Sequence, residues 1–142
     1  MQPKASAKSG TAAAPNSSAV TVRYQVAALD PSIAFYTQQL GFKLDQRTGP
    51  FAQVSRGNLA LILSGPGTSG ARVMPDGRKQ EPGGWNRIVL YVDDLHATIE
   101  KLNAAGVHFR NQIEVGPGGS QILVDDPDGN PIELHEAPKT SR

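Results

Sequence analysis

The chain has 142 residues, enough for one domain with a sizeable core, and its 14 Lys and Arg against 13 Asp and Glu give a net charge of +1. Without Lys4 and Lys8 of the N-terminal segment the remainder is close to neutral, and the pattern lacks the clustered basic residues typical of a nucleic-acid partner. The absence of cysteine excludes disulfides, thiolate metal sites and a cysteine nucleophile.

The N-terminal segment consists mainly of small and polar residues. Residues 1–18 contain no apolar block and predict a disordered tail, and residues 138–142 predict a second, short one. The sequence shows neither the apolar core of a secretory signal nor an apolar run long enough to span a membrane. We therefore expect a cytoplasmic protein without a membrane partner.

The first half predicts a strand, a helix and three further strands. Apolar and polar side chains alternate over 20–26, the period of a half-buried strand. Asp30 is expected to cap the following helix and Gly41 to end it. Three short strands are expected at 42–45, 51–55 and 59–63.

Residues 64–84 are rich in glycine and proline, with charged residues among them. A loop of this length in a compact domain is typical either of a functional lid or of a connector. Because it joins two similar halves, we interpret it as a connector, with a lid as the alternative. The expected domain over 19–137 then has modules at about 19–64 and 85–137, joined by a loop over 65–84.

The second half repeats this order more clearly. A strand is expected over 87–92, Asp94 is placed to cap the next helix, and Gly106 to end it. Asp128 and Gly129 suit a tight turn because both residue types tolerate positive φ. The closing strands are expected at 107–115, 121–125 and 131–136. The halves repeat at about 65 residues, which indicates one duplicated unit rather than a solenoid of three or more repeats.

Three segments carry a resemblance to a known family: 29–42 (LDPSIAFYTQQLGF), 92–95 (VDDL) and 126–134 (DPDGNPIEL). In this order and spacing the chain resembles the vicinal oxygen chelate superfamily, which includes glyoxalase I-like and bleomycin-resistance-like proteins, over about residues 19–137. The resemblance implies an α+β fold of paired βαβββ modules that form a U-shaped cleft, and a homodimer.

Many members of that family bind one divalent metal through four side chains, one from the first and one from the last strand of each module. The resemblance places these positions at Thr21, at Ala60 or Ile62, at Arg87 and at Glu133. A threonine hydroxyl is a poor ligand, an aliphatic side chain offers none, and a guanidinium has no lone pair. Only Glu133 matches, so we expect no cofactor at these positions, although a divalent metal elsewhere is left open.

Two interpretations of the residues around Glu133 follow. His135 shares a strand face with Glu133, and Gln25 could join them in a different metal set, but a polar histidine near the strand end is the interpretation that we favour. An unpaired buried Glu133 would be costly, so we predict that Arg87 pairs with it and takes the electrostatic role of the metal. The alternative is that Arg87 reaches solvent at the sheet edge.

Strand alternation predicts which side chains line the cleft. The candidate ligand-binding residues are Thr21, Arg23, Gln25, Arg87, Tyr91, Glu133 and His135. Apolar walls with a few polar groups are typical of small-molecule sites, and the two arginines favour an anionic or carbonyl-bearing ligand. A solvated sheet face is the alternative. Trp85 is expected at a dimer interface or stacked on a flat ligand.

Three functions are consistent with this pattern. The favoured one is a dimeric, metal-free module that binds a small molecule, aromatic or carbonyl-containing. The second is a lyase, isomerase or dioxygenase of the same superfamily acting on a carbonyl or vicinal-oxygen substrate, in which Glu133 could act as base and Arg87 stabilise an oxyanion. The third is an interaction module without a ligand, which a cleft filled by side chains would indicate.

Overall fold

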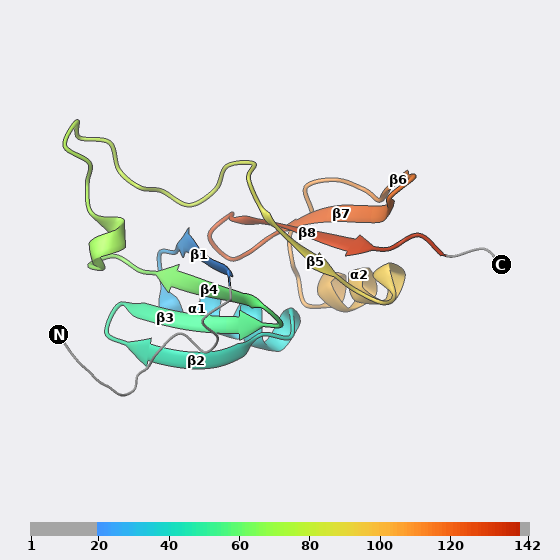
Figure 1. Ribbon diagram of the computed structural model, residues 1–142, viewed down its shortest axis with the longest axis horizontal. Coiled ribbons are helices and arrows are strands. Elements are labelled where there is room, and N and C mark those ends of the chain that lie inside the picture. The colour runs from blue at the N-terminus through green and yellow to red at the C-terminus, as the bar shows by residue number, and fades with distance from the viewer. Residues whose placement is uncertain (1–19, 140–142) are drawn as a thin grey trace. The chain divides into compact units, whose positions relative to one another are not determined.

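The computed structural model describes residues 20–139 and divides the chain into two compact units, one ending at Gln80 and one beginning at Glu81 (Figure 1). The expected tail over 1–18 lies outside the described residues, as do residues 140–142 of the second expected tail. No helix within 20–139 is long and apolar enough to cross a membrane.

Unit 1 is one four-stranded sheet in the order β1-β4-β3-β2. Strands β1 and β4 are parallel, and the other pairs are antiparallel. Its elements are β1 (Val20–Gln25), α1 (Leu29–Ala34), the π-helical turn η2 (Phe35–Gln39), β2 (Lys43–Thr48), β3 (Phe51–Arg56), β4 (Leu59–Ser64) and the 3₁₀ turn η3 (Ser69–Ala71).

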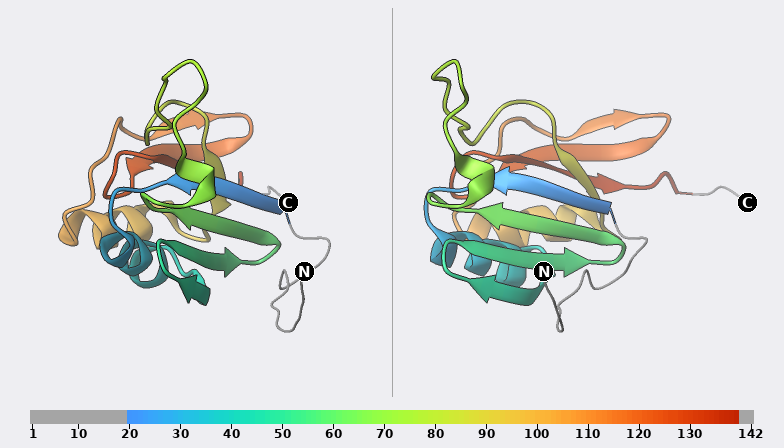
Figure 2. Two further views of the ribbon diagram at one scale, coloured as in Figure 1. Left: turned by 90° about the vertical axis from the view of Figure 1, so that its left-hand side faces the viewer. Right: turned by 60° about the vertical axis from the view of Figure 1, so that its left-hand side comes forward.

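The core of unit 1 lies between its helix and its sheet. Helix α1 packs on β3 and β4, and Figure 2 shows the helical segment along one face of the sheet. Tyr36 is fully buried, with Phe35 and Phe42 edge-to-face against its ring. Gly41, with φ of 75°, ends the helical segment as predicted.

The predicted cap at Asp30 is wrong. Helix α1 begins at Leu29, after Ala28, and no side chain caps it. Asp30 therefore lies in the first turn, where its carboxylate pairs with Arg47 of β2. A carboxylate in the first turn still interacts favourably with the free N–H groups of the helix end, which explains why the sequence signal was displaced by one or two residues.

Unit 2 repeats the topology, with the strand order β5-β8-β7-β6 and the parallel pair β5 and β8. Its elements are β5 (Ile88–Tyr91), α2 (Leu95–Ala104), β6 (Glu114–Gly116), β7 (Gly119–Asp125) and β8 (Pro131–Glu136). Helix α2 packs on β8, where Ile132 and Leu134 are fully buried. Strand alternation places Glu133 and His135 on the other side, which we call the polar face of unit 2.

Two predictions for unit 2 are confirmed and two need correction. The Asp94 side chain accepts the Ala97 N–H at 3.0 Å and caps α2, and Gly106 follows the helix with φ of 80°. Strand β5 begins at Ile88, so Arg87 precedes it. The strand expected over 107–115 is reduced to β6 and one isolated bridge, between Phe109 and Val124, because the backbone turns away between them.

Candidate functional site

The polar face of unit 2 brings together four of the predicted site residues. In the register of β5 and β8, Val89 lies beside Glu133 and Tyr91 beside His135. Arg87, one residue before β5, extends along the same face and reaches the Glu133 carboxylate. The grouping therefore follows from the parallel pairing of two short strands.

The predicted ion pair between Arg87 and Glu133 is confirmed. Nε and Nη2 of Arg87 donate to Oε1 of Glu133 at 3.1 and 3.0 Å. The Glu133 side chain is 10% exposed and that of Arg87 27% exposed, so the pair is largely shielded from water but retains an open edge at the guanidinium. A charge-assisted bond of this kind offsets the desolvation of the carboxylate.

His135 uses both of its ring nitrogens. Nε2 lies 2.8 Å from the Gly118 carbonyl oxygen, and Nδ1 lies 3.1 Å from Oε2 of Glu133. A carbonyl only accepts, so Nε2 carries a hydrogen, and a carboxylate next to Arg87 requires a second hydrogen on Nδ1. The Gly118 carbonyl first, and then Glu133, raise the pKa of His135 above its ordinary value of 6.5. Protonation of the ring is therefore favoured relative to that of a free histidine.

These bonds bear on the metal that the resemblance implies. Both Glu133 oxygens are already engaged by Arg87 and His135, and both His135 nitrogens lie against oxygen acceptors, whereas a metal ligand needs a lone pair directed at the ion. Arg87 adds a fixed positive charge next to the one matching carboxylate. Within residues 20–139 no three His, Cys, Asp or Glu side chains are grouped to hold a metal ion. The residues at these positions do not fit a divalent metal.

Exposed apolar surface borders this cluster. Val89 is 43% and Tyr91 62% exposed, and the Tyr91 ring lies 5.0 Å from that of His135. Single exposed apolar side chains are common, but Val89 and Tyr91 lie on one strand face beside charged groups, and apolar surface with a few polar groups is the composition of a ligand site.

Unit 1 uses its predicted site residues differently. The Gln25 amide donates to the Gly70 carbonyl at 2.8 Å, and Nη1 of Arg23 donates to Ser64 Oγ at 3.2 Å. Arg23 lies so close to Gly70 that a Cβ added there would be 2.2 Å from Nη1. Both side chains hold the η3 turn against the sheet, whereas Thr21 is exposed beside Ala60.

A chain of hydrogen bonds runs from Arg23 through the Ser64 and Thr68 hydroxyls to the Gly65 carbonyl. Thr68 Oγ1 donates to the Gly65 carbonyl at 2.9 Å, so the short 2.6 Å contact between Ser64 and Thr68 uses the Ser64 proton. Ser64 then accepts from Arg23. The beginning of the loop at 65–71 is therefore part of unit 1 and not free connector.

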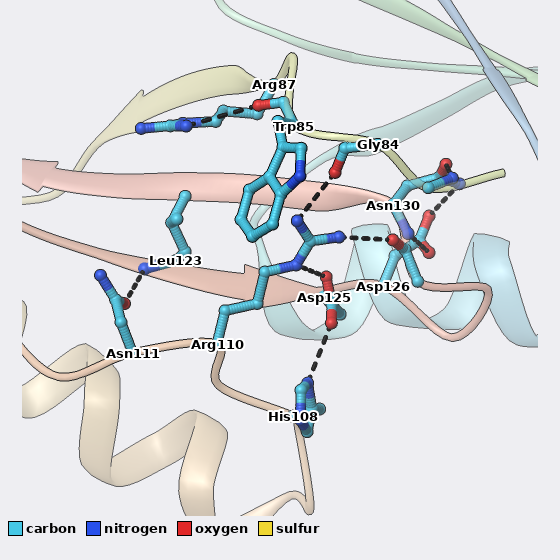
Figure 3. A network of polar contacts seen from close by, with 12 residues as sticks. Gly84, Trp85, Arg87, His108, Arg110, Asn111, Leu123, Asp125, Asp126 and Asn130 are labelled. Carbon is cyan, nitrogen blue, oxygen red and sulfur yellow. Dashed lines mark hydrogen bonds and ion pairs between the residues drawn. The ribbon is translucent and has the colours of Figure 1, made fainter.

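A second cluster in unit 2 centres on Arg110 (Figure 3). Its guanidinium lies 4.7 Å from the centre of the Trp85 ring and donates to Asp125 at 2.7 Å, to the Gly84 carbonyl at 2.8 Å and to the Gly129 carbonyl at 2.9 Å. His108 contacts the other Asp125 oxygen at 2.9 Å. The cluster ties the start of unit 2 to the turn between β7 and β8.

Sequence reasoning missed this cluster, although one signal was present. Asp126 accepts N–H bonds from Asp128 and Asn130, and Asn130 accepts the Gly83 N–H at 2.8 Å. The Asp-Pro-Asp-Gly-Asn segment thus forms a turn through its own side chains and binds a distant backbone as well. The polar side chains of this segment could have indicated that it binds another segment, but not which one.

Comparisons with known proteins agree with this architecture. Residues 18–134 match the family described as Glyoxalase/Bleomycin resistance protein/Dioxygenase superfamily. A lactoylglutathione lyase of Haemophilus influenzae is 33% identical over 123 residues, which cover 82% of this chain and 90% of that protein. A second lactoylglutathione lyase, from Salmonella typhimurium, is 34% identical over 125 residues, covering 83% of this chain and 91% of that protein.

Solved structures show the same fold. A member of the superfamily from Sphaerobacter thermophilus is 27% identical with a TM-score of 0.66, covering 83% of this chain and 95% of that one. TnmS3, described as an antibiotic binding protein from a Streptomyces species, is 26% identical with a TM-score of 0.65, covering 89% of this chain and 100% of that one. The extent of these matches, together with the duplicated sheets, shows that the chain belongs to the Glyoxalase/Bleomycin resistance protein/Dioxygenase superfamily.

Proposed function

We propose that this protein binds a small molecule and does so without the divalent metal of its superfamily. The observation that carries the proposal is the bonding of Glu133, whose two oxygens accept from Arg87 and from His135. Arg87 takes the electrostatic role that a metal has in other members. TnmS3, whose description is an antibiotic binding protein, supports binding as a function for this fold.

Catalysis is the second candidate, and the lactoylglutathione lyases at 33–34% identity favour it. A general base needs a free lone pair at the reacting proton. Both Glu133 oxygens are engaged in hydrogen bonds with Arg87 and His135, so neither is directed at a substrate proton in this arrangement. Binding is therefore better supported than a metal-free version of that chemistry.

The remaining expectations stay predictions. They are a homodimer, a cytoplasmic location, and a U-shaped cleft to which Thr21, Arg23 and Gln25 contribute along with the polar face of unit 2. Light scattering on the purified chain tests the homodimer, since a monomeric mass would contradict it.

The experiment that tests the proposed function combines a metal and a ligand measurement. Untagged protein is incubated with Ni²⁺, Zn²⁺, Mn²⁺ and Fe²⁺, freed of excess ion and analysed for metal; we expect less than about 0.1 metal per chain. Arg87→His is the matched variant, because it replaces the guanidinium by a possible ligand next to Glu133 and His135, and it should retain more metal.

Saturation-transfer NMR against a mixed panel of neutral and charged ring compounds then tests binding. A stoichiometric metal in the wild-type protein, or lactoylglutathione lyase activity that appears with added metal, would make the enzyme the correct function. Absence of any bound compound in the panel would contradict the binding function.

A further inference from the structure

Strand β5 presents three different chemical groups in a row along the polar face of unit 2. Arg87 supplies a cation, Val89 an exposed aliphatic side chain and Tyr91 an exposed ring. Alternate residues of a strand are about 6.6 Å apart, so the row extends over about 13 Å. That length matches an elongated small molecule with a charged end and an apolar end.

The guanidinium of Arg87 has donors to spare. It carries five N–H groups, of which those on Nε and Nη2 serve Glu133 and one on Nη1 makes a long, 3.4 Å bond to the Trp85 carbonyl. By this count one N–H on each terminal nitrogen remains. Two N–H groups on one planar fork are suited to a carboxylate, which accepts both.

The charges around this fork favour an anion. Arg87 already balances the charge of the single carboxylate here, that of Glu133, and the other group bonded to it is His135, whose pKa is raised by the Gly118 carbonyl and by Glu133. Asp125 is matched by Arg110 and His108. Glu114 of β6 pairs with Gln121 of β7, which in turn pairs with His135 of β8. Glu114 is therefore two strands away from His135, at about 10 Å.

We infer that the ligand of this face is an aromatic monoanion, with its carboxylate or equivalent oxyanion on the free edge of Arg87 and its ring system on Val89 and Tyr91. The inference rests on the proposed function and adds the ligand class to it. Apolar contact supplies affinity, and the guanidinium selects for the charge.

Two probes that differ in charge alone test this inference. 2-Naphthoate and its neutral isostere 2-naphthamide are titrated by equilibrium dialysis, with the fluorescence of Trp85, the single tryptophan, as a second readout. We expect naphthoate to bind at least about tenfold more tightly, the effect of a charge-assisted bond pair. Cyclohexanecarboxylate, which has the charge without the aromatic ring, should bind more weakly than naphthoate.

Variants then assign the selectivity to residues. In Arg87→Met/Glu133→Gln no buried carboxylate is left unpaired, so the fold is preserved while the fork is lost; the naphthoate preference should fall to within about twofold. Tyr91→Ala should weaken both probes, and Tyr91→Phe neither. Arg78→Met, which removes an exposed arginine of unit 1, is the control that should change nothing.

The outcomes separate the inference from the proposed function. Equal affinity for naphthoate and naphthamide, or a preference that survives in the double variant, would overturn the aromatic-anion inference and leave small-molecule binding intact. Failure of both probes to bind would overturn the inference as well. Only an empty result from the mixed panel would in addition remove the proposed function.

Discussion

The two units have the same strand order but carry different side chains on the sheet face that points away from the helix. The last strand of unit 1 places Ala60 and Ile62 beside β1, and the last strand of unit 2 places Glu133 and His135 beside β5. In unit 1 the cation Arg23 bonds to a hydroxyl and holds a loop, whereas in unit 2 Arg87 bonds to a carboxylate. The comparison teaches that duplication preserved the backbone pairing while the polar side chains took separate roles, loop anchoring in one copy and charge clustering in the other.

The largest expected effect concerns a glycine of unit 2 that approaches a backbone closely, compared with a glycine of unit 1 that approaches a side chain. A Cβ on Gly119, whose φ is 120°, would lie 2.1 Å from the Glu136 carbonyl oxygen, whereas one on Gly70 meets only the flexible end of Arg23. Gly119→Ala should therefore lower the free energy of unfolding by about 3 kcal/mol, measured by urea titration. Gly118→Ala, with open space around it, is the control. Equal stability of the two variants would contradict the close approach.

The second effect compares the two arginines. Arg87→Met leaves the largely buried Glu133 with His135 alone and should cost about 2 kcal/mol, less than for a fully buried pair because Arg87 is partly exposed. Arg23→Met should cost less than about 1 kcal/mol, since Arg23 is exposed and bonds to a neutral hydroxyl. Urea unfolding of both variants checks this, and adding Glu133→Gln to Arg87→Met should restore much of the loss. Similar costs for the two arginines would remove the proposed contrast between the units.

The third effect is smaller and concerns the loop anchor. Gly70→Ala should displace the Arg23 guanidinium from Ser64 and cost up to about 1 kcal/mol, the worth of one hydrogen bond. Because the only loss is that contact, the same change made in an Arg23→Ala background should be nearly neutral, which a double-mutant cycle measures. Additive costs would place the strain in the backbone of η3 instead.

The smallest effect is a pH dependence that belongs to unit 2. The folded pKa of His135 lies above its unfolded value, so the resulting stability is present in full below pH 6.5 and is lost as pH rises through the folded pKa. Glu133→Gln should lower the pKa of His135, which an NMR titration of the ring resonances measures. The pKa should still stay above its ordinary value, because the bond to the Gly118 carbonyl remains. An unchanged pKa in this variant would mean that Glu133 does not contribute.

The sequence was sufficient for local features and for one long-range contact. Strand alternation and the cost of a buried charge were enough to predict that Arg87 pairs with Glu133, because Glu133 lies in its predicted strand and Arg87, although it precedes β5, lies on the predicted face. The partner of His135 Nε2 could not be predicted, since Gly118 offers only a backbone carbonyl in a turn. The contact of Gln25 with Gly70 is of the same kind, and backbone acceptors carry no residue signature.

The loop between the modules has a further consequence. Its first part is bound to Gln25 through the Gly70 carbonyl and its last part to Arg110 through the Gly84 carbonyl, so the segment that links the anchored parts is only 72–80. That segment is folded back on itself by bonds from the Gln80 side chain to the Arg72 carbonyl and between Met74 and Arg78. Fully extended, nine residues would reach about 30 Å, so breaking these two bonds would let the segment lengthen without unfolding either sheet.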